Sequence, residues 1–397
     1  MKSIIFTLVI LIPVLLTACT KQASEGQTEL RTVSIEQCFA TEQAMDISQI
    51  ADTVEYLELK TPKDIVVARI FNIVPGDGFW LIQTKDGIFK FTREGEFIKQ
   101  IGRKGQGPGE YLQIRGIEYD PVRKEIIHAD MQQVLYYDQD GNFLRDVKIN
   151  DCFFNISFSD SVLWTCNLCM HVDKYMACAL NREGDTIAAV PNPNYGMESL
   201  NTDGFYFNSP LDLREFSRYK GALYMKTRAS NDTVFQLSGP KWIPYLYIDM
   251  GKYKMPVEYE MWYSRDSYEK NATRYWNVPR LEEDDRYLFL TAVRQKNTNE
   301  MRGHEDDHKY IVYDKSKGKG FVTKGEKGIK ITDDILGGPA IWPRWVTDDY
   351  YIGTVEWYDL SQELKSGNYT LSPAFKQQFE HWGHDTNQLI VLGHRKK

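Results

Sequence analysis

Two histidines separated by three acidic residues form the motif whose chemistry is easiest to name. Residues 304–308 read His-Glu-Asp-Asp-His, which matches the H-E-x-x-H pattern of zinc proteases. That pattern binds zinc on a helix, where both histidines share one face and the glutamate acts as a base. Here Gly303 precedes the motif and a strand-like run starts at Tyr310. We therefore expect a polar loop between two strands, with incidental metal binding by His304 and His308 as the alternative.

A second group of possible ligands lies between residues 166 and 178. Cys166, Cys169, His171 and Cys178 could suggest a metal or redox cluster. In a continuous strand, however, residues three apart point to opposite faces, and a redox dithiol precedes a helix, which is not predicted here. A hairpin turning near Val172 would place Cys166 opposite Cys178. Core or surface cysteines are the main expectation, and a cross-strand disulfide is the alternative.

Glycines crowd residues 101–111, which read Ile-Gly-Arg-Lys-Gly-Gln-Gly-Pro-Gly-Glu-Tyr between two strand-like runs. A phosphate-binding loop would need G-K-[ST] at the start of a helix, and a dinucleotide fingerprint would need glycine where Glu110 stands. Neither condition is met. Glycine reaches positive φ without steric cost and proline fixes its own φ, so the stretch predicts a corner between two sheets.

Aromatic side chains gather late in the chain, at Trp342, Trp345, Trp357, Tyr358 and Trp382. On a concave surface they could stack on sugar rings, because tryptophan and tyrosine offer a flat apolar face with a polar group. Packing inside the propeller sheets is the main expectation for each single residue, and sugar binding is the alternative. The chain has no G-x-S-x-G motif, so nothing indicates a serine hydrolase.

Charge narrows the choice of partners. The chain has 48 basic and 55 acidic side chains, and its basic residues form no long block. Binding to a phosphate backbone needs a basic footprint, so nucleic acid is not an expected partner. No motif indicates a cofactor.

The N-terminus has the features of an export signal. Lys2 precedes an apolar run from Ile4 to Leu16, which is shorter than the roughly 20 residues of a transmembrane helix. Residues 16–19, Leu-Thr-Ala-Cys, look like a bacterial lipobox with Cys19 as the lipidated residue. An ordinary secretory signal with an incidental cysteine is the alternative.

This interpretation divides the chain into three parts. Residues 1–18 are the lipoprotein signal peptide, 19–45 a lipidated tether and linker, and 46–397 the folded domain. Thr20 follows the cysteine in place of the aspartate typical of inner-membrane retention. We therefore expect a cell-envelope protein anchored in the outer membrane.

Strand-pair motifs recur along the folded part. Residues 87–101 align with 133–147, and a third copy spans 178–187, each with a glycine-containing turn between alternating apolar residues. Short apolar runs precede the hairpins and their weaker copies, at Phe79, Ile126, Val162, Leu223, Tyr287 and Tyr350. Repeats of about 40 to 60 residues that cannot bury both faces alone predict a six-bladed β-propeller, with a β-sandwich as the alternative.

The repeats also carry a family resemblance. Residues 140–149, Asp-Gly-Asn-Phe-Leu-Arg-Asp-Val-Lys-Ile, and the corner 102–111 resemble NHL-type propeller repeats. From about residue 50 onward the chain is similar to the six-bladed β-propeller lipoproteins of gut-dwelling Bacteroidetes, with further matches at 54–62, 231–237, 245–256, 333–343 and 387–397. The resemblance implies an all-β fold and carries no settled activity.

The propeller interpretation is accompanied by two further structural predictions, one for ring closure and one for helices. Strand 54–59 should complete the last sheet beside strand 389–392, because unpaired edge strands invite aggregation. Short helical insertions are expected in the C-terminal half, at 257–270 and from Ser372-Pro373 onward, where serine suits the N-cap and proline the first turn.

Propeller topology indicates where a ligand would bind. The link between the second and third strands of a blade and the link to the next blade emerge on one face. The corner 103–111, the loops near His171, Arg228 and His304, and the insertion 357–388 are of these two kinds. We expect a pocket on that face, bordered by Arg103, Lys104, Arg115, Arg228, Trp357 and Trp382.

The sequence favours binding over catalysis. The leading hypothesis is a lipid-anchored envelope propeller that contacts the membrane through its anchor and binds a glycan, a peptide or a partner protein. The alternative is an enzyme that uses the propeller channel, such as a lyase or a glycosidase-like protein, with catalytic residues not identified. A scaffold within an outer-membrane complex is a third possibility.

Overall fold

The computed structural model describes residues 30–67, 69–131, 133–149, 155–167, 172–196, 215–227, 231–256, 274–294, 307–325, 329–365, 371–378, 380 and 387–396. All the strands fall within one compact unit, Arg31–Lys397. The following description concerns that unit.

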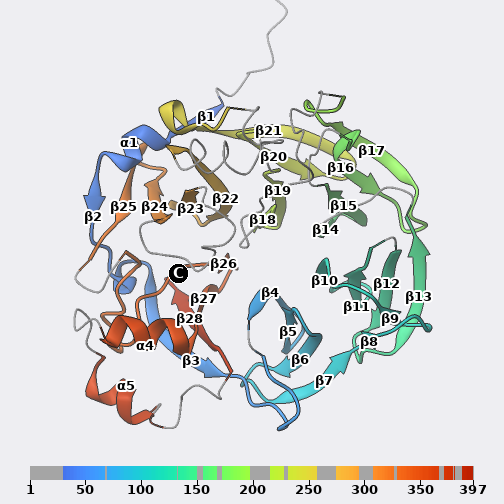
Figure 1. The fold of residues 1–397 in the computed structure, drawn as a ribbon, viewed down its shortest axis with the longest axis horizontal. Helices are drawn as coiled ribbons and strands as arrows, with labels where there is room; N and C mark the ends of the chain where they lie inside the picture. The colour runs from blue at the N-terminus through green and yellow to red at the C-terminus, as the bar shows by residue number, and fades with distance from the viewer. Residues whose placement is uncertain are drawn as a thin grey trace, which may run out of the picture. The chain divides into compact units, whose positions relative to one another are not determined.

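Six β-sheets surround a common axis, and each is a blade of an all-β propeller (Figure 1). In every blade consecutive strands pair antiparallel, from the strand nearest the axis to the outer rim. Blade one contains β4 (Ile70–Pro75), β5 (Phe79–Thr84), β6 (Ile88–Thr92) and β7 (Phe97–Ile101). Blade two contains β10 (Gly116–Asp120), β11 (Glu125–Ala129), β12 (Gln133–Asp138) and β13 (Phe143–Lys148). Blade three contains β14 (Asn155–Ser159), β15 (Val162–Cys166), β16 (Tyr175–Leu180) and β17 (Thr186–Pro191).

The other three blades also incorporate N-terminal strands. Blade four contains β18 (Phe216–Tyr219), β19 (Ala222–Met225), β20 (Thr233–Ser238) and β21 (Lys241–Asp249), with β1 (Arg31–Ser34) at its rim. Blade five contains β22 (Trp276–Glu283), β23 (Tyr287–Arg294), β24 (His308–Asp314) and β25 (Lys319–Thr323), with β2 (Glu42–Gln43) at its rim. Blade six contains β26 (Trp345–Val346), β27 (Tyr350–Val355), β28 (Leu389–Arg395) and β3 (Ala51–Glu58). The six-bladed prediction is confirmed, and the six apolar runs are the second strands of the blades.

The blades are held together by apolar cores at their boundaries. One cluster lies between each pair of neighbouring blades, as with Leu81 of blade one and Leu135 of blade two, or Leu246 of blade four and Leu290 of blade five. Blade six meets blade one in the same way, through Ile390 and Ile82. The second strands, such as β5 and β15, are therefore buried on both faces, whereas outer strands such as β13 stay partly exposed.

The glycine of the repeated hairpin serves both the turn and the packing between blades. In blade three, Oδ1 of Asn181 accepts a hydrogen bond from the amide of Asp185 (2.8 Å). Gly184 within this turn has φ 90°, a conformation that other residues rarely adopt. A Cβ at Gly184 would also lie 2.4 Å from Val147 of blade two. Glycine is thus required there for two independent reasons.

Ring closure follows the prediction made from the two ends of the domain. β3 pairs antiparallel with β28, so that Glu58 lies opposite Leu389 and Val54 opposite Gly393. The N-terminal strand is the outermost strand of the last sheet, as expected.

Residues 31–45, which the sequence assigned to a linker, are part of the propeller unit. β1 adds in parallel to β21, and β2 adds in parallel to β25. Between them, α1 (Ile35–Phe39) buries the side chains of Ile35 and Cys38. Together with η1 (Ile47–Gln49) and β3, this segment forms an N-terminal belt, residues 31–58, around blades four, five and six. Strands of two and four residues carry too little periodicity to be predicted from sequence.

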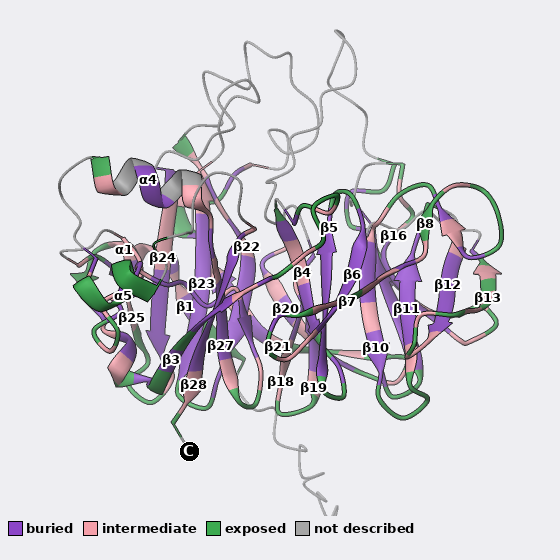
Figure 2. Cartoon of the chain, turned by 90° about the horizontal axis from the view of Figure 1, so that it is seen from below, coloured by how far each residue is buried: buried purple, intermediate pink, exposed green. Residues whose placement is uncertain are grey.

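The two faces of the ring differ in the length of their connections. The turns between first and second and between third and fourth strands contain two to five residues, and we call their side the tight-turn face. The links between second and third strands and between blades emerge on the other side, the long-link face, and reach 33 residues between β27 and β28. Figure 2 shows α4 (Trp357–Lys365) and β8 (Arg103–Lys104) at the same side of the ring.

Helices occur in the last long link, as the sequence indicated. α5 (Pro373–Gln378) begins after Ser372, whose hydroxyl accepts a hydrogen bond from the amide of Phe375 (3.1 Å). The helix predicted at 257–270 lies outside the described residues. The short η2 (Gly251–Tyr253) precedes this segment. Within the described ranges, no helix has the length and apolar character needed to span a membrane.

Candidate functional site on the long-link face

The structure describes some of the predicted site residues and not others. Cys19, Arg228, His304 and Trp382 lie outside the described residues. Arg103 and Lys104 are exposed in β8, while Arg115 and Trp357 are half-buried. The corner that carries Arg103 joins blades one and two, whereas Trp357 belongs to blade six. These described residues therefore do not converge on a single point.

The glycine-rich stretch is the corner between two blades, as predicted, and its conformation is fixed by Glu110. β8 pairs in parallel with β9 (Glu110–Tyr111). The Glu110 carboxylate accepts hydrogen bonds from the amide of Gly107 (2.9 Å) and from Nε of Arg103 (2.6 Å). These two contacts hold the pKa of Glu110 below its usual value. The Arg103 side chain nevertheless stays 80% exposed.

Beneath the corner lies a buried aromatic pair. Tyr111 is completely buried and its ring packs edge-on against His128 of β11, with 4.7 Å between ring centroids. Nδ1 of His128 lies 3.2 Å from the carbonyl oxygen of Gly116. Burial lowers the pKa of His128 to about 4, so the ring is neutral near pH 7. The phenolic hydroxyl of Tyr137 donates to the carbonyl oxygen of Gly109 (3.0 Å), which fixes the corner from a second side.

A buried carboxylate joins this corner to the next loop of blade two. Asp130 is 2% exposed and follows β11 directly. Its oxygens accept hydrogen bonds from the amides of Leu112 (3.1 Å), Gln113 (2.9 Å) and Met131 (2.7 Å). Although burial acts in the opposite direction, the amide hydrogen bonds hold the pKa of Asp130 below its usual value. The backbone at Leu112 and at Met131 is thus fixed to one anchor.

Both residues held by Asp130 expose their own apolar side chains. Leu112 is 53% exposed and Met131 is 42% exposed. Among the described residues, the long-link face exposes further large apolar side chains at Val66, Val172, Tyr195 and Leu336, whereas the tight turns expose only Val122. Large exposed apolar patches are a feature of contact surfaces, so we take the pair Leu112 and Met131 as a candidate one. Sequence reasoning missed Leu112 and Met131, because nothing in their neighbourhood predicts which apolar residues face solvent.

The basic residues around this pair include three that the sequence singled out. Lys85 and Asp86 in the turn after β5 adjoin the corner, where Lys104 Nζ lies 3.8 Å from Asp86. We define the corner patch as the two apolar residues with the surrounding cations, namely Lys85, Arg103, Lys104, Leu112, Arg115 and Met131. Its acidic neighbours are the exposed Asp86, the partly covered Glu110 and the buried Asp130.

The other chemical candidates occupy separate places. His308 begins β24 and its ring stacks beside Tyr310, with 6.4 Å between centroids. Trp357 packs against the core between blades five and six. In the described part of the chain, no three histidine, cysteine or carboxylate side chains form a group able to hold a metal ion.

The cross-strand disulfide considered for blade three is not formed between Cys166 and Cys178. In the β15–β16 pair, Cys166 lies opposite Ala177 and Cys178 opposite Thr165. The register is therefore displaced by one residue, and the two side chains enter different cores, one shared with blade four and one shared with blade two. Both cysteines are buried core residues, which was the main expectation.

Charged groups near the axis bind to one another across blades. Ser157 of β14 donates to Oε1 of Glu118 of β10 (2.5 Å). The guanidinium of Arg218 in β18 lies 3.4 Å from the other oxygen of Glu118. This carboxylate beside the axis therefore joins the first strands of blades two, three and four.

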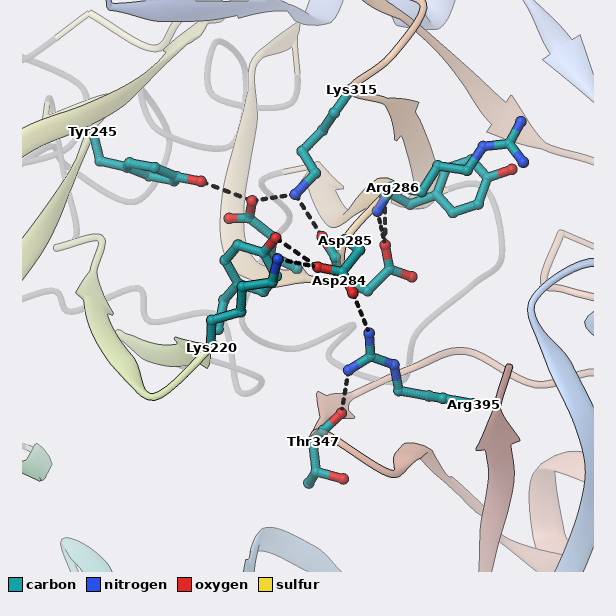
Figure 3. Close-up of polar contacts among 11 residues, drawn as sticks. Lys220, Tyr245, Asp284, Asp285, Arg286, Lys315, Thr347 and Arg395 are labelled. Atoms are coloured by element: carbon teal, nitrogen blue, oxygen red, sulfur yellow. Dashed lines mark hydrogen bonds and ion pairs between the residues drawn. The ribbon is translucent and has the colours of Figure 1, made fainter. Parts of the chain in front are cut away.

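A larger polar network connects blades four, five and six on the tight-turn face (Figure 3). Lys315 Nζ lies 2.6 Å from Glu283, and the two side chains are 9% and 2% exposed. The Tyr245 hydroxyl also donates to Glu283 (2.7 Å), and burial together with this carboxylate raises the pKa of Tyr245 far above its usual value. Asp285 lies 2.7 Å from Lys220 and 3.7 Å from Arg395, so it links the three blades. These charges join three blades, whereas the ion pairs of β8 in the corner patch stay within the corner and the neighbouring turn of blade one.

The six blades, the closure by β3 and the connections together define a six-bladed β-propeller, with most of its exposed apolar loop residues on the long-link face. The family model described as Domain of unknown function (DUF4934) matches residues 30–394, and the chain belongs to this family. No curated protein matches the sequence.

Solved structures from Bacteroides share the fold. A protein from Bacteroides fragilis that is described as exported is 18% identical, with a TM-score of 0.67 over 92% of this chain and 100% of that one. A member of the DUF4221 family from Bacteroides vulgatus is 12% identical, with a TM-score of 0.50 over 87% of this chain and 97% of that one. At these identities the similarity concerns the fold alone.

Proposed function

We propose that the protein is a lipid-anchored propeller of the cell envelope that binds a glycan, a peptide or a partner protein through its long-link face. The observation that carries this proposal is the corner patch, where Asp130 fixes the backbone of two exposed apolar residues. A scaffold that holds such side chains rigidly in water loses little conformational freedom when a partner covers them. Of the other predicted residues, Trp357 begins α4 in the link between β27 and β28, which emerges on the same face.

The difference between the two faces supports this assignment. On the tight-turn face, Asp285 of blade five pairs with Lys220 of blade four and Arg395 of blade six. Lys315 pairs with Glu283 within blade five and lies 4.4 Å from the centre of the Tyr219 ring of blade four. On the long-link face, Leu112 and Met131 stay exposed while their backbone is bound from below. Loops on a rigid scaffold are the usual place for recognition.

A binding screen tests this function directly. The chain without residues 1–19 is applied to a glycan array and to a displayed peptide library, beside a variant carrying Leu112→Ser and Met131→Ser. We expect a ligand that the wild type binds and the double variant binds at least about tenfold less, since burial of one such side chain contributes roughly 1.5–3 kcal/mol. The matched control is Val122→Ser, which removes an 86% exposed apolar side chain from the tight-turn face. Equal binding by all three proteins would contradict the assignment.

We also propose that Cys19 is lipidated and that the outer membrane holds the protein, with hairpins of the NHL type forming the propeller. The apolar run ending at Leu16 and the Leu-Thr-Ala-Cys sequence support the anchor. Cell fractionation tests it: wild-type protein should sediment with the envelope and be released by detergent, whereas Cys19→Ala should be recovered in the soluble fraction. Equal sedimentation of the two proteins would rule out this anchor.

A further inference from the structure

We infer that the corner patch binds a protein segment in which an apolar side chain stands beside carboxylates. This inference deepens the proposed binding function and rests on it. It commits to one class of ligand, an acidic peptide segment, and to one position on the long-link face, the junction of blades one and two.

The apolar part of the patch consists of two exposed side chains whose backbone is held by the same carboxylate. The backbone amides of Leu112 and Met131 donate to different oxygens of the Asp130 carboxylate, so one side chain fixes the backbone of both residues. Methionine adapts its shape to varied apolar partners because it is unbranched and polarizable. An apolar side chain placed against both residues would cover surface that is now 53% and 42% exposed.

The charged part of the patch selects for acid. The same corner carries four cations, Lys85, Arg103, Lys104 and the half-buried Arg115, against three carboxylates, Asp86, Glu110 and the buried Asp130. The Glu110 side chain is only 19% exposed and already accepts two hydrogen bonds, while Arg103 is 80% and Lys104 54% exposed. A protein with net charge −7 therefore presents a locally basic surface here. Carboxylates of a partner would complement it, and arginine can pair with them in a bidentate manner.

The composition of the patch favours a peptide over a glycan. Glycan recognition by stacking needs flat aromatic faces, and none of the six patch residues is aromatic. The aromatic residue of the corner itself, Tyr111, is completely buried against His128. The geometry is therefore that of an apolar anchor point with cations around it.

The test is a selection of random 12-residue displayed peptides on the chain without residues 1–19, followed by affinity measurements with the enriched peptides. We expect enrichment of peptides that combine Asp or Glu with a large apolar residue. Binding should fall at least about tenfold in Leu112→Ser with Met131→Ser. It should fall similarly in Arg103→Glu with Lys104→Glu, and it should weaken as salt concentration rises. The matched control is Val122→Ser with Lys241→Glu, which changes one exposed apolar and one exposed basic residue at tight turns.

Each other outcome counts against the inference in a distinguishable way. Peptides that bind but are neutral or basic would overturn the proposed ligand class while leaving a binding function in place. If acidic peptides bind the corner variants and the wild type equally well but bind the Trp357→Ala variant less tightly, the binding site lies on blade six. That result would overturn the proposed position. Failure to enrich any peptide, combined with a glycan that depends on Leu112, would overturn the peptide inference and retain the proposed face. Failure of both screens would overturn both proposals.

Discussion

At the scale of single residues, Asp130 has the most consequential environment in the described part of the chain. It is nearly inaccessible, yet its carboxylate is saturated by backbone amides of two separate loops. An ionised carboxylate at such a position stabilises the folded state through charge-assisted hydrogen bonds, which are stronger than neutral ones.

Asp130→Asn should therefore destabilise the protein. The amide side chain turns one acceptor into a donor that faces backbone N–H groups, and hydrogen bonds to charged groups contribute about 1.5–3 kcal/mol each. We expect the free energy of unfolding to fall by about 2 kcal/mol or more in urea titrations. Asp140→Asn, in an exposed turn of the same blade, is the control and should change it by less than about 0.5 kcal/mol. Similar values for both variants would show that the carboxylate does not hold the loops.

His128 makes stability depend on pH. Its pKa is lowered by burial to about 4 in the folded chain, whereas an unfolded histidine titrates near 6.5. Between these two values the unfolded chain binds a proton that the folded chain does not, so stability falls as pH decreases from about 6.5 to 4. The loss attributable to His128 is at most about 3 kcal/mol.

Urea unfolding of wild type and His128→Gln across pH 4 to 8 measures this contribution. The variant lacks the titration, so its stability should decline less steeply between about pH 6.5 and 4, whatever its stability at pH 7. Parallel curves for the two proteins across that range would mean that His128 protonation is not coupled to unfolding.

At the scale of elements, the N-terminal belt is the main departure from the usual closure of a propeller. Its strand β3 completes blade six, while β1 and β2 cover the rims of blades four and five. Parallel addition at the rim blocks edges that could otherwise pair with another chain. Ile35 and Cys38 of the belt helix α1 are buried in the core between blades four and five, and burial raises the pKa of the Cys38 thiol to about 11.

Ile35→Ala should show that the belt contributes to global stability. Ile35 is completely buried, and removing a buried isoleucine to alanine costs about 2–5 kcal/mol. The control is Ile98→Ala in β7, where the side chain is 44% exposed and the change should stay below about 1 kcal/mol. The change in unfolding free energy of each variant is obtained from its urea unfolding midpoint, with the slope of the transition held constant. An Ile35→Ala midpoint equal to that of the control would mean that the belt detaches before the propeller unfolds.

At the scale of the whole molecule, the six interfacial cores make the ring cooperative. Each blade packs against two neighbours, and β3 adds Leu57 to the core between blades six and one that β27 and β28 also form. Removal of the belt should therefore affect blades far from it in sequence.

A chain that begins at residue 61 tests this dependence. It lacks β1, β2 and β3, so the outer edges of β21, β25 and β28 lose their partners. We expect aggregates or higher oligomers in size-exclusion chromatography with light scattering, because open strand edges pair between chains. A chain that begins at residue 31 keeps the belt and should elute as a folded species with a single unfolding transition. If the chain that begins at residue 61 is a well-folded monomer, the propeller does not require the belt for closure.

Much of the fold could be predicted from the sequence because the propeller is built from local signals. Glycine turns such as the one at Gly184, the six apolar second strands and the corner at 101–111 each reflect contacts within one hairpin or between adjacent blades. The pairing of the two ends could be predicted as well, since an unpaired strand near the N-terminus and a missing strand in the last blade require each other.

The tertiary structure alone decided the belt and the corner patch. β1 and β2 are too short for periodicity to show, and their positions depend on edges provided by residues more than 200 positions away. Cys166 and Cys178 differ from a disulfide pair by one residue of register, which no local pattern fixes. In the corner, the sequence identified Arg103, Lys104 and Arg115 as residues of one face. It did not identify Leu112 and Met131, because their exposure depends on Asp130, a carboxylate that reaches them only in the folded chain.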